Sequence, residues 1–137
     1  MKRTDEGYTL TEMLVVIAII GLLAAVLTPM IAGQLGRARV KAARLQVENV
    51  STAIEMFRSD VGRYPTAQEG LRVLVAAPEG LEGWIGPYIR NAKSLDDPWG
   101  RPLQYEAPSD ATSPHVVSLG ADGKTGGSGA NADIVGS

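Results

Sequence analysis

Residues 13–32 read MLVVIAIIGLLAAVLTPMIA, and Thr28 is the only polar side chain among them. No charged residue occurs between Glu12 and Arg37. A helix needs about 20 apolar residues to cross the hydrocarbon core of a bilayer, so this run is long enough to span it. A signal peptide has a shorter apolar core of about 7 to 15 residues. We therefore expect a membrane helix here, and the alternatives are a signal peptide or a buried core helix.

Basic residues flank the apolar run unevenly. Lys2 and Arg3 precede it. Four basic residues follow it, namely Arg37, Arg39, Lys41 and Arg44. Because segments rich in Lys and Arg usually stay on the cytoplasmic side of a membrane, charge counting alone predicts that the C-terminal region is cytoplasmic.

A second helical pattern follows the apolar run. Apolar residues recur at alternating spacings of three and four, which places them on one stripe of a helix. They are Val40, Ala43, Val47, Val50, Ile54, Phe57 and Val61. This pattern predicts an amphipathic helix over residues 33–62 that covers a small globular domain, with Gly62 suited to a left-handed C-cap. A dimeric coiled coil is the alternative, although three heptads are marginal for one.

Residues 63–137 are rich in turns and predict a small domain. Thr66 and Glu69 have the spacing of a capping box, which predicts a short helix that begins near Ala67. The aromatic residues Trp84, Tyr88 and Trp99 are expected to pack in the small core rather than to bind a ligand.

Two short segments of this domain predict strands. They cover residues 103–107 and 116–119, where polarity alternates with a period of two. The combination favours an α+β fold, in which a small antiparallel sheet packs against the helical stripe. Residues 120–137 are rich in Gly and Ala and lack periodicity, so they predict a loop or tail.

The composition excludes several classes of function. The chain has 137 residues with 13 Lys and Arg against 15 Asp and Glu, so its net charge of -2 gives no bulk electrostatic case for nucleic-acid binding. It has no cysteine, which excludes a disulfide scaffold, a thiolate nucleophile and a cysteine-based metal site. Its only histidine, His115, has no plausible catalytic partner and predicts a surface or sheet-edge role. The sequence therefore predicts no enzyme.

The residues before the apolar run form a specific arrangement. A short hydrophilic leader ends in Gly7, the aromatic Tyr8 follows, and the acid Glu12 lies four residues later at the edge of the run. In this arrangement the chain resembles the type IV pilin and pseudopilin family. The resemblance implies cleavage between Gly7 and Tyr8 by a membrane prepilin peptidase, followed by methylation of the new Tyr8 amine. Asp5 and Glu6 depart from the more basic leaders of that family.

The position of Glu12 calls for a physical explanation. A carboxylate in hydrocarbon is costly unless it has a partner. The resemblance implies that its partner is the Tyr8 amine of an adjacent subunit, so that Glu12 sets the register of helices in a filament. The alternative is an interfacial acid that never enters the bilayer. The resemblance also places the leader in the cytoplasm and the C-terminal domain outside, against the charge count, because leader processing requires that topology.

Four further segments narrow the resemblance. They are RYPTAQEGL at 63–71, WIGPY at 84–88, DPWGRPLQY at 97–105 and SLGADG at 118–123. With these segments the chain is similar, over essentially its whole length, to the major pseudopilins of type II secretion systems.

That family binds calcium in the loop after the small sheet, which corresponds to residues 118–134. Calcium prefers six to eight oxygen ligands, which carboxylates and free carbonyls in a flexible loop provide. The ligands that we expect are the side chains of Asp122, Asn131 and Asp133 and the carbonyl of Leu119, with Ser128 as a weaker one. Six glycines, at 120, 123, 126, 127, 129 and 136, would let the backbone fold around an ion. The alternative is a plain solvated tail.

The resemblance implies a structural subunit of the type II secretion pseudopilus, which polymerises through its N-terminal helix to drive export of folded proteins across the outer membrane. Residues 1–7 would be the cleaved leader, 8–32 the transmembrane helix and filament core, 33–62 the amphipathic helix and 63–137 the globular domain. The expected location is a single pass through the bacterial inner membrane, with the globular domain in the periplasm. The expected partners are further copies of itself, minor pseudopilins, the inner-membrane secretion platform and the prepilin peptidase.

Three other readings remain open from the sequence. A minor pseudopilin or a type IV pilus subunit would share the N-terminal arrangement, but the absence of cysteine argues against the C-terminal disulfide loop that is common in pilins. A signal-anchored periplasmic enzyme would need a nucleophile and a base, and the sequence offers no such pair.

Overall fold

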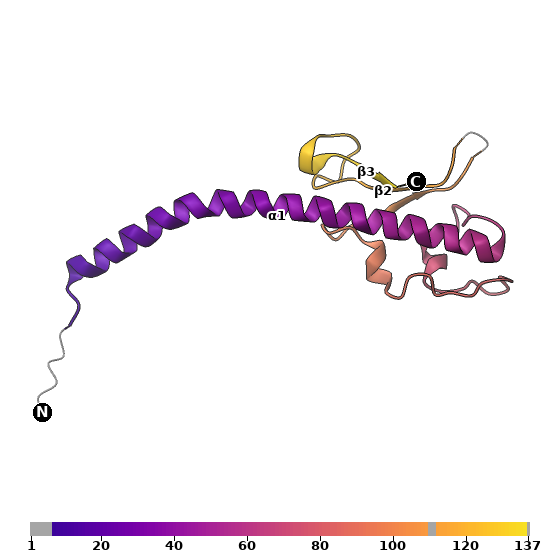
Figure 1. Cartoon of the computed structure of the whole chain (residues 1–137), viewed down its shortest axis with the longest axis horizontal. Helices are drawn as coiled ribbons and strands as arrows, with labels where there is room; N and C mark the ends of the chain where they lie inside the picture. The colour runs from indigo at the N-terminus through magenta and orange to yellow at the C-terminus, as the bar shows by residue number, and fades with distance from the viewer. Residues whose placement is uncertain (1–6, 110–111, 137) are drawn as a thin grey trace, which may run out of the picture. The chain divides into compact units, whose positions relative to one another are not determined.

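A computed structural model describes residues 7–109 and 112–136 of the chain (Figure 1). It contains one long helix, α1 (Leu10–Val61), three short 3-10 helices and three short strands. The chain divides into two compact units, one up to Gly36 and one from Arg37 onward.

The N-terminal unit consists of the apolar part of α1. An 18-residue window of this helix has a mean hydropathy of 2.8 and is not buried at all, so by length and composition the helix could cross a membrane. Pro29 lies inside the helix, which continues through it. The Thr28 hydroxyl donates to the Ala24 carbonyl (2.6 Å), which satisfies the one polar side chain of the run. The aliphatic side chains of this unit are therefore exposed.

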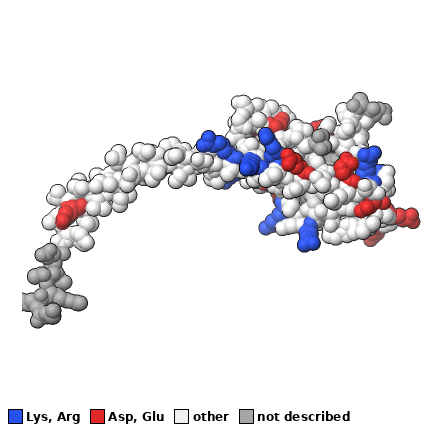
Figure 2. All heavy atoms as spheres, viewed as in Figure 1, with Lys and Arg blue, Asp and Glu red and all other residues white. Residues whose placement is uncertain are grey.

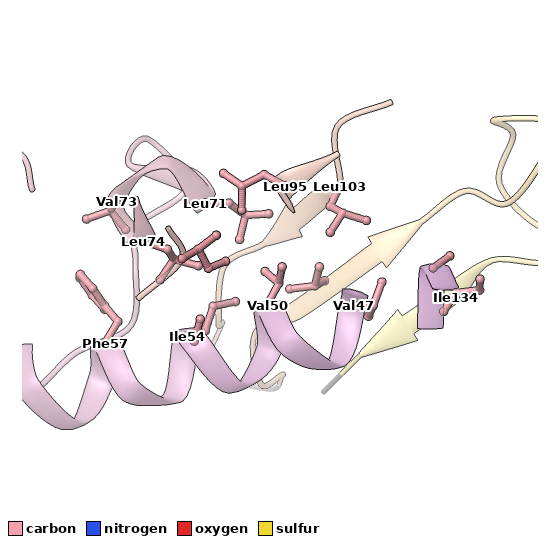
Figure 3. Close-up of a cluster of buried hydrophobic side chains, with 14 residues drawn as sticks. Val47, Val50, Ile54, Phe57, Leu71, Val73, Leu74, Leu95, Leu103 and Ile134 are labelled. Atoms are coloured by element: carbon pink, nitrogen blue, oxygen red, sulfur yellow. The ribbon is translucent and has the colours of Figure 1, made fainter. Parts of the chain in front are cut away.

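The C-terminal part of α1 provides one side of a hydrophobic core (Figure 3). The predicted stripe is confirmed, because its central members are buried and its end members, Val40 and Val61, are only partly buried. The helix residues in the core are Ala43, Val47, Val50, Ala53, Ile54 and Phe57. Gly62 takes a positive φ of 82°, and its N–H donates to the Arg58 carbonyl (2.8 Å), so it ends the helix as expected.

The sheet is antiparallel and has three strands in the order β1 (Gln104–Glu106), β2 (His115–Ser118) and β3 (Ile134–Gly136). The first two match the predicted strands. The prediction that residues 120–137 form only a loop or tail is wrong, because β3 pairs with β2. A strand of three residues is too short to show a period of two in the sequence. Its last residue, Gly136, packs so closely on α1 that a Cβ atom there would collide with Val47 and Ser51.

The 3-10 helices are η1 (Gly70–Leu74), η2 (Ala92–Leu95) and η3 (Gly129–Asn131). The helix predicted to begin near Ala67 is therefore a 3-10 helix that begins three residues later. Gly70 has a positive φ of 56°, which interrupts a right-handed helix and turns residues 67–69 into a tight turn. The Gly70 N–H donates to the Thr66 carbonyl (2.9 Å) and closes that turn.

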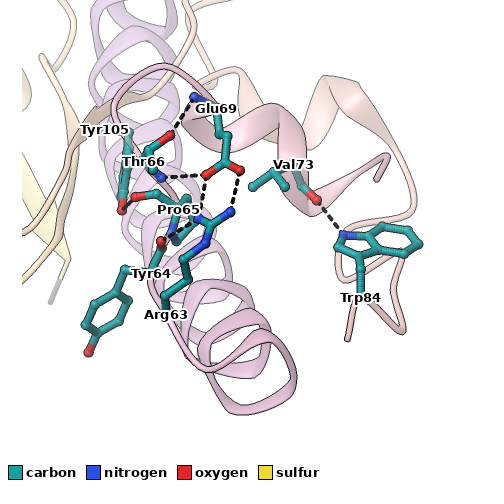
Figure 4. A network of polar contacts seen from close by, with 8 residues as sticks. All are labelled: Arg63, Tyr64, Pro65, Thr66, Glu69, Val73, Trp84 and Tyr105. Carbon is teal, nitrogen blue, oxygen red and sulfur yellow. Dashed lines mark hydrogen bonds and ion pairs between the residues drawn. The ribbon is translucent and has the colours of Figure 1, made fainter. Parts of the chain in front are cut away.

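The predicted capping pair is present at this turn (Figure 4). The Thr66 N–H donates to Glu69 Oε2 (2.8 Å), and the Glu69 N–H donates to Thr66 Oγ1 (3.2 Å). The Arg63 guanidinium donates to both oxygens of Glu69 at 2.7 Å each. The hydrogen bonds from Arg63, followed by those from Thr66, lower the pKa of Glu69 to about 2.

The aromatic side chains pack as expected. The Tyr88 ring packs edge-on against the Phe57 ring, with their centroids 5.9 Å apart. It packs in the same way against the Trp84 ring, with their centroids 5.7 Å apart. Trp84 Nε1 donates to the Val73 carbonyl (2.8 Å), which gives its polar atom a partner (Figure 4). Trp99 is partly buried against the same core.

Glu69 predicts a specific loss of stability in acid. Its pKa is depressed from an ordinary value of 4.5 to about 2, so the stability it contributes is present above about pH 4.5 and is lost as the pH falls toward 2. We expect Glu69→Gln to reduce the urea midpoint of the full-length chain in detergent at pH 7, read by tryptophan fluorescence. The difference from wild type should shrink between pH 4.5 and 2.

The control is Glu79→Gln, which removes an exposed carboxylate from the next loop. It should show no such convergence. A difference between Glu69→Gln and wild type that stays constant over this pH range would contradict the assignment.

Candidate functional site

The residues singled out at the N-terminus lie at the start of α1. Tyr8 is 81% exposed and Gly7 is exposed, so the peptide bond between them is accessible. Glu12 lies in the first turn of the helix, where the helix dipole favours negative charge.

Glu12 forms a capping box with Thr9 that the sequence analysis missed. The Thr9 N–H and hydroxyl both donate to Glu12 Oε2, at 2.9 and 3.0 Å. The Glu12 N–H donates in return to Thr9 Oγ1 (3.2 Å). The spacing Thr-x-x-Glu before an apolar run is itself the signal of such a cap, and it was available in the sequence. Glu12 therefore helps to begin the helix as well as carrying a charge at the edge of the apolar run.

The aliphatic side chains that follow Glu12 have no cover within their own unit. They are exposed around the whole circumference of the helix rather than on one stripe. A helix that is apolar on every side is stable only in lipid or among other helices. This part of α1 can therefore insert into a membrane or pack against further copies of itself.

The predicted metal ligands lie in the connection between β2 and β3 (Figure 1). Ser118 pairs directly with Ile134, so the loop comprises residues 119–133, and the expected boundaries of 118 and 134 are its two flanking strand residues. The Ala121 N–H donates to the Ala130 carbonyl (2.8 Å) and holds the two arms of the loop together. The predicted ligands are therefore carried by one closed loop.

Two of the five predicted ligands accept hydrogen bonds from backbone N–H groups of the loop. Asp133 Oδ2 accepts from the Gly126 N–H (2.8 Å), and Asp122 Oδ1 accepts from the Lys124 N–H (3.1 Å). Asp133 Oδ1 is buried and has no hydrogen-bond partner in the part of the chain that the structure describes. A buried carboxylate oxygen without a partner is costly, and a cation would satisfy it.

The other three predicted ligands are less constrained. Leu119 is half-buried directly after β2, and its carbonyl lies at the entrance of the loop. Ser128 and Asn131 are exposed at the two ends of η3, and over residues 7–109 and 112–136 their side chains make no hydrogen bond. Over the same residues, no three His, Asp or Glu side chains gather closely enough to hold a metal. A site here would depend on the two carboxylates together with amide and backbone oxygens.

Glycine is required at two points of the loop by close contacts. Gly120 and Gly127 have positive φ values of 65° and 92°. A Cβ atom would lie 2.8 Å from the Asn131 carbonyl oxygen at Gly120 and 2.5 Å from it at Gly127. Gly136, which was expected to serve the loop, lies in β3 instead. At Gly120 and Gly127, therefore, only glycine leaves room for the Asn131 carbonyl oxygen.

A buried carboxylate that the sequence analysis did not single out anchors this loop to the rest of the domain. Asp97 is only 6% exposed. Its Oδ1 accepts from the Trp99 and Arg101 N–H groups (3.0 and 2.9 Å), and its Oδ2 accepts from the Ser118 hydroxyl (3.2 Å). Arg101 Nε lies 3.5 Å from Oδ2, and Arg101 Nη2 donates to the Gly120 carbonyl. The Asp-Pro turn at 97–98 could have signalled this role.

His115 begins β2 opposite Glu106 and is half-buried, so it lies in the central strand of the sheet rather than in an edge strand. Its Nδ1 is buried without a hydrogen-bond partner among the described residues. Gly-Lys-Thr at 123–125 matches the end of a phosphate-binding loop motif, but that motif needs a helix after it, and the η3 that follows has only three residues.

Two family models match the chain. The model described as "Prokaryotic N-terminal methylation motif" matches residues 2–28, and the model described as "Type II secretion system (T2SS), protein G" matches residues 30–137.

Relatives of known name are similar over nearly the whole chain. The type II secretion system core protein G of Pseudomonas aeruginosa is 39% identical over 137 residues, covering 97% of this chain and 95% of the relative. The protein of the same name from Vibrio cholerae is 37% identical over 135 residues, covering 96% and 91%. The crystal structure of the major pseudopilin from the type 2 secretion system of enterohaemorrhagic Escherichia coli is 27% identical, with a TM-score of 0.59 over 76% of this chain and 90% of that chain.

These matches agree with the fold and with the N-terminal arrangement. Together they cover both the leader and the globular domain, and the relatives are similar over most of their own length. The chain therefore belongs to the type II secretion system protein G family.

Proposed function

We propose that the chain is the major structural subunit of a type II secretion pseudopilus, which polymerises through the apolar part of α1. The observation that carries the proposal is an uncharged, wholly exposed helical segment directly after a methylation motif, in a chain of the protein G family. Before assembly, this segment would hold the subunit in the inner membrane with its globular domain in the periplasm. Further copies of the chain, minor pseudopilins and the secretion platform of that membrane would be its partners.

Processing would prepare the chain for assembly. A prepilin peptidase would cut the exposed bond between Gly7 and Tyr8 and leave a methylated Tyr8 amine. Thr9 keeps its N–H and hydroxyl after this cut, so the capping box with Glu12 survives. The new positive charge would then lie four residues before a carboxylate in the first turn of the same helix.

Assembly would exchange lipid contacts for contacts between helices. Because lipid tails are as apolar as the helix itself, the hydrophobic effect gives little net gain, and close packing and polar pairing must favour the filament. Pairing of Glu12 with the Tyr8 amine of a neighbouring subunit would supply one such polar contact. It would also fix the register, since a shifted helix would leave the charge without its partner in an apolar surrounding.

The loop at 119–133 would bind calcium and stabilise the domain. Its chemistry fits the ion, because Asp122 and Asp133 provide two carboxylates and Asp133 Oδ1 is buried without a partner. The Leu119 carbonyl, Asn131 and Ser128 would complete the oxygen ligands. When bound, Ca²⁺ would supply the partner that the buried Asp133 Oδ1 lacks. Asp133 already bonds to Gly126, so the ligand set would connect the tip of the loop to the start of β3.

The first test concerns processing. We expect the chain isolated from cells that contain the prepilin peptidase to begin at methylated Tyr8, as measured by intact and N-terminal peptide mass spectrometry. The same chain from cells without the peptidase should retain residues 1–7. A chain that keeps these residues in the presence of the active peptidase would contradict the proposal.

The second test separates the charge of Glu12 from its capping role. Glu12→Ala removes both, Glu12→Gln keeps a hydrogen-bond acceptor for Thr9, and Thr9→Val removes the hydroxyl but keeps the charge. If pairing of the charge drives assembly, both Glu12 variants should remain in the membrane but fail to form pseudopili, whereas Thr9→Val should assemble. The measurement is the yield of sheared filaments relative to the membrane-bound subunit. Normal assembly of Glu12→Gln would refute the pairing role.

The third test concerns calcium. We expect chelation to lower the melting temperature of the full-length chain in detergent, and readdition of Ca²⁺ to restore it. An ion at a hundred times its Kd adds about 2.7 kcal/mol to the stability of the folded state. For a small domain, each kcal/mol shifts the midpoint by about 4 to 8 °C, so the change should exceed several degrees.

Asp122→Asn and Asp133→Asn should lower the melting temperature in calcium and respond less to chelation than wild type does. Glu82→Gln, which removes an exposed carboxylate outside the loop, is the matched control and should respond like wild type. Melting curves of wild type that coincide with and without calcium would count against the site.

A further inference from the structure

Three basic side chains share one face of α1 at the start of the C-terminal unit. Arg37, Lys41 and Arg44 are spaced by four and three residues, so they follow one another along one side of the helix. All three are exposed, and basic atoms gather along this part of the chain (Figure 2). Arg39 lies two residues from Arg37 and therefore on another face of the helix.

The three side chains line a hollow of about 300 Å³. Val40 forms an apolar part of its lining, and the second wall comes from Gly129 and Ala130 of the loop between β2 and β3. That wall is held by backbone hydrogen bonds, from Ala121 N–H to the Ala130 carbonyl (2.8 Å) and from Asn131 N–H to the Ser128 carbonyl (3.1 Å). The three basic side chains therefore border a mostly apolar hollow whose second side is held in place.

None of the three cations is neutralised by an acidic group in the part of the chain that the structure describes. The ion pairs found there involve Glu55, Glu69 and Asp97 only. Glu48, one turn after Arg44, forms no ion pair with it. Like charges at these helical spacings repel one another, so an anion with several oxygens would relieve the repulsion. Arginine is well suited to such an anion because its guanidinium can donate two parallel hydrogen bonds to a phosphate.

The place of these residues in the chain points to the source of the phosphate. Arg37 comes five residues after Ala32, the end of the apolar run. The headgroup layer borders the hydrocarbon core, and basic residues directly after a membrane helix attract anionic lipids there. Basic residues are disfavoured on the side of the membrane to which the proposed topology assigns them. A role at the headgroups would account for their presence on that side.

We propose that Arg37, Lys41 and Arg44 bind the phosphate of an anionic phospholipid headgroup, such as phosphatidylglycerol, in the leaflet that faces the globular domain. Val40 would contact the glycerol region, and the loop wall at Gly129 and Ala130 would close the other side. This inference rests on the membrane insertion contained in the proposed function. The site would add a headgroup contact to the membrane anchorage of the unassembled subunit.

The test uses the full-length chain in detergent with an equimolar mixture of phosphatidylglycerol and phosphatidylcholine that carry the same acyl chains. Native mass spectrometry gives the ratio of the two lipids retained by the protein. Each basic residue near an anionic surface contributes about a fivefold preference, so replacing all three by Gln should lower the ratio by at least about tenfold. The conservative pair Arg37→Lys and Arg44→Lys should keep most of the preference, because it keeps the charges.

The matched control replaces Arg72, Arg90 and Lys93 by Gln, which removes the same charge from exposed positions away from the hollow. It should retain the wild-type ratio. An equal loss in the control, or no loss in the variant of Arg37, Lys41 and Arg44, would overturn the proposal. Displacement of phosphatidylglycerol by inorganic phosphate at the same concentration as the lipid would also overturn it in favour of a free-phosphate site.

Two further measurements distinguish the lipid site from membrane insertion alone and from contact with a second copy of the chain. Flotation of each variant with phosphatidylcholine vesicles reports membrane insertion alone, so failure of wild type to float would overturn the proposed function as well as this site. If the cations instead face an acidic surface of a second copy, the Gln variant should cross-link less in phosphatidylcholine membranes and keep its preference for phosphatidylglycerol. That result would refute the lipid assignment and leave the proposed function intact.

Discussion

The structure of the globular domain depends on covering one stripe of α1. Six of the fourteen residues in its hydrophobic core come from this helix, and the 3-10 helices, strands and loops provide the remainder. Strands of three and four residues cannot form a stable sheet in isolation, so they need an apolar surface on which to pack. The helix therefore provides one side of the core of the domain that it carries.

The structure of the domain also depends on a polar group at the edge of the core, the carboxylate of Asp97. Asp97 is buried and satisfied by four groups, one of which is the guanidinium of Arg101. Arg101 then bonds to the Gly120 carbonyl at the entrance of the loop between β2 and β3. The base of that loop is thus held by the core, whereas Asp122, Ser128 and Asn131 lie farther along and are exposed. An ion bound by this loop would add its binding free energy to the stability of the folded domain.

The sequence allowed a correct prediction where a pattern repeats along the chain. It did not where a single long-range contact determines the structure. The stripe from Val40 to Val61 repeats through several helical turns, so the amphipathic helix and its buried face could be predicted. The strand at Ile134–Gly136 could not, because its pairing with β2 and the close approach of Gly136 to α1 are long-range contacts. Gly70 shows the same limit, since its positive φ converts a correctly predicted capping box into a tight turn. For the candidate site, Asp122 and Asp133 were predictable as carboxylates in a glycine-rich loop, but the buried oxygen of Asp133 was not.

The proposed assembly limits how tightly the chain can bind lipid. If assembly exchanges lipid contacts for contacts between helices, as proposed, every contact that holds the subunit in the bilayer opposes assembly. Three exposed cations at a surface of high dielectric constant interact with a phosphate weakly and reversibly, since water and salt screen them. A phosphate site buried in the domain would bind far more tightly and would trap the subunit in the membrane. The exposure of Arg37, Lys41 and Arg44 would therefore keep the proposed headgroup contact weak enough to be compatible with assembly.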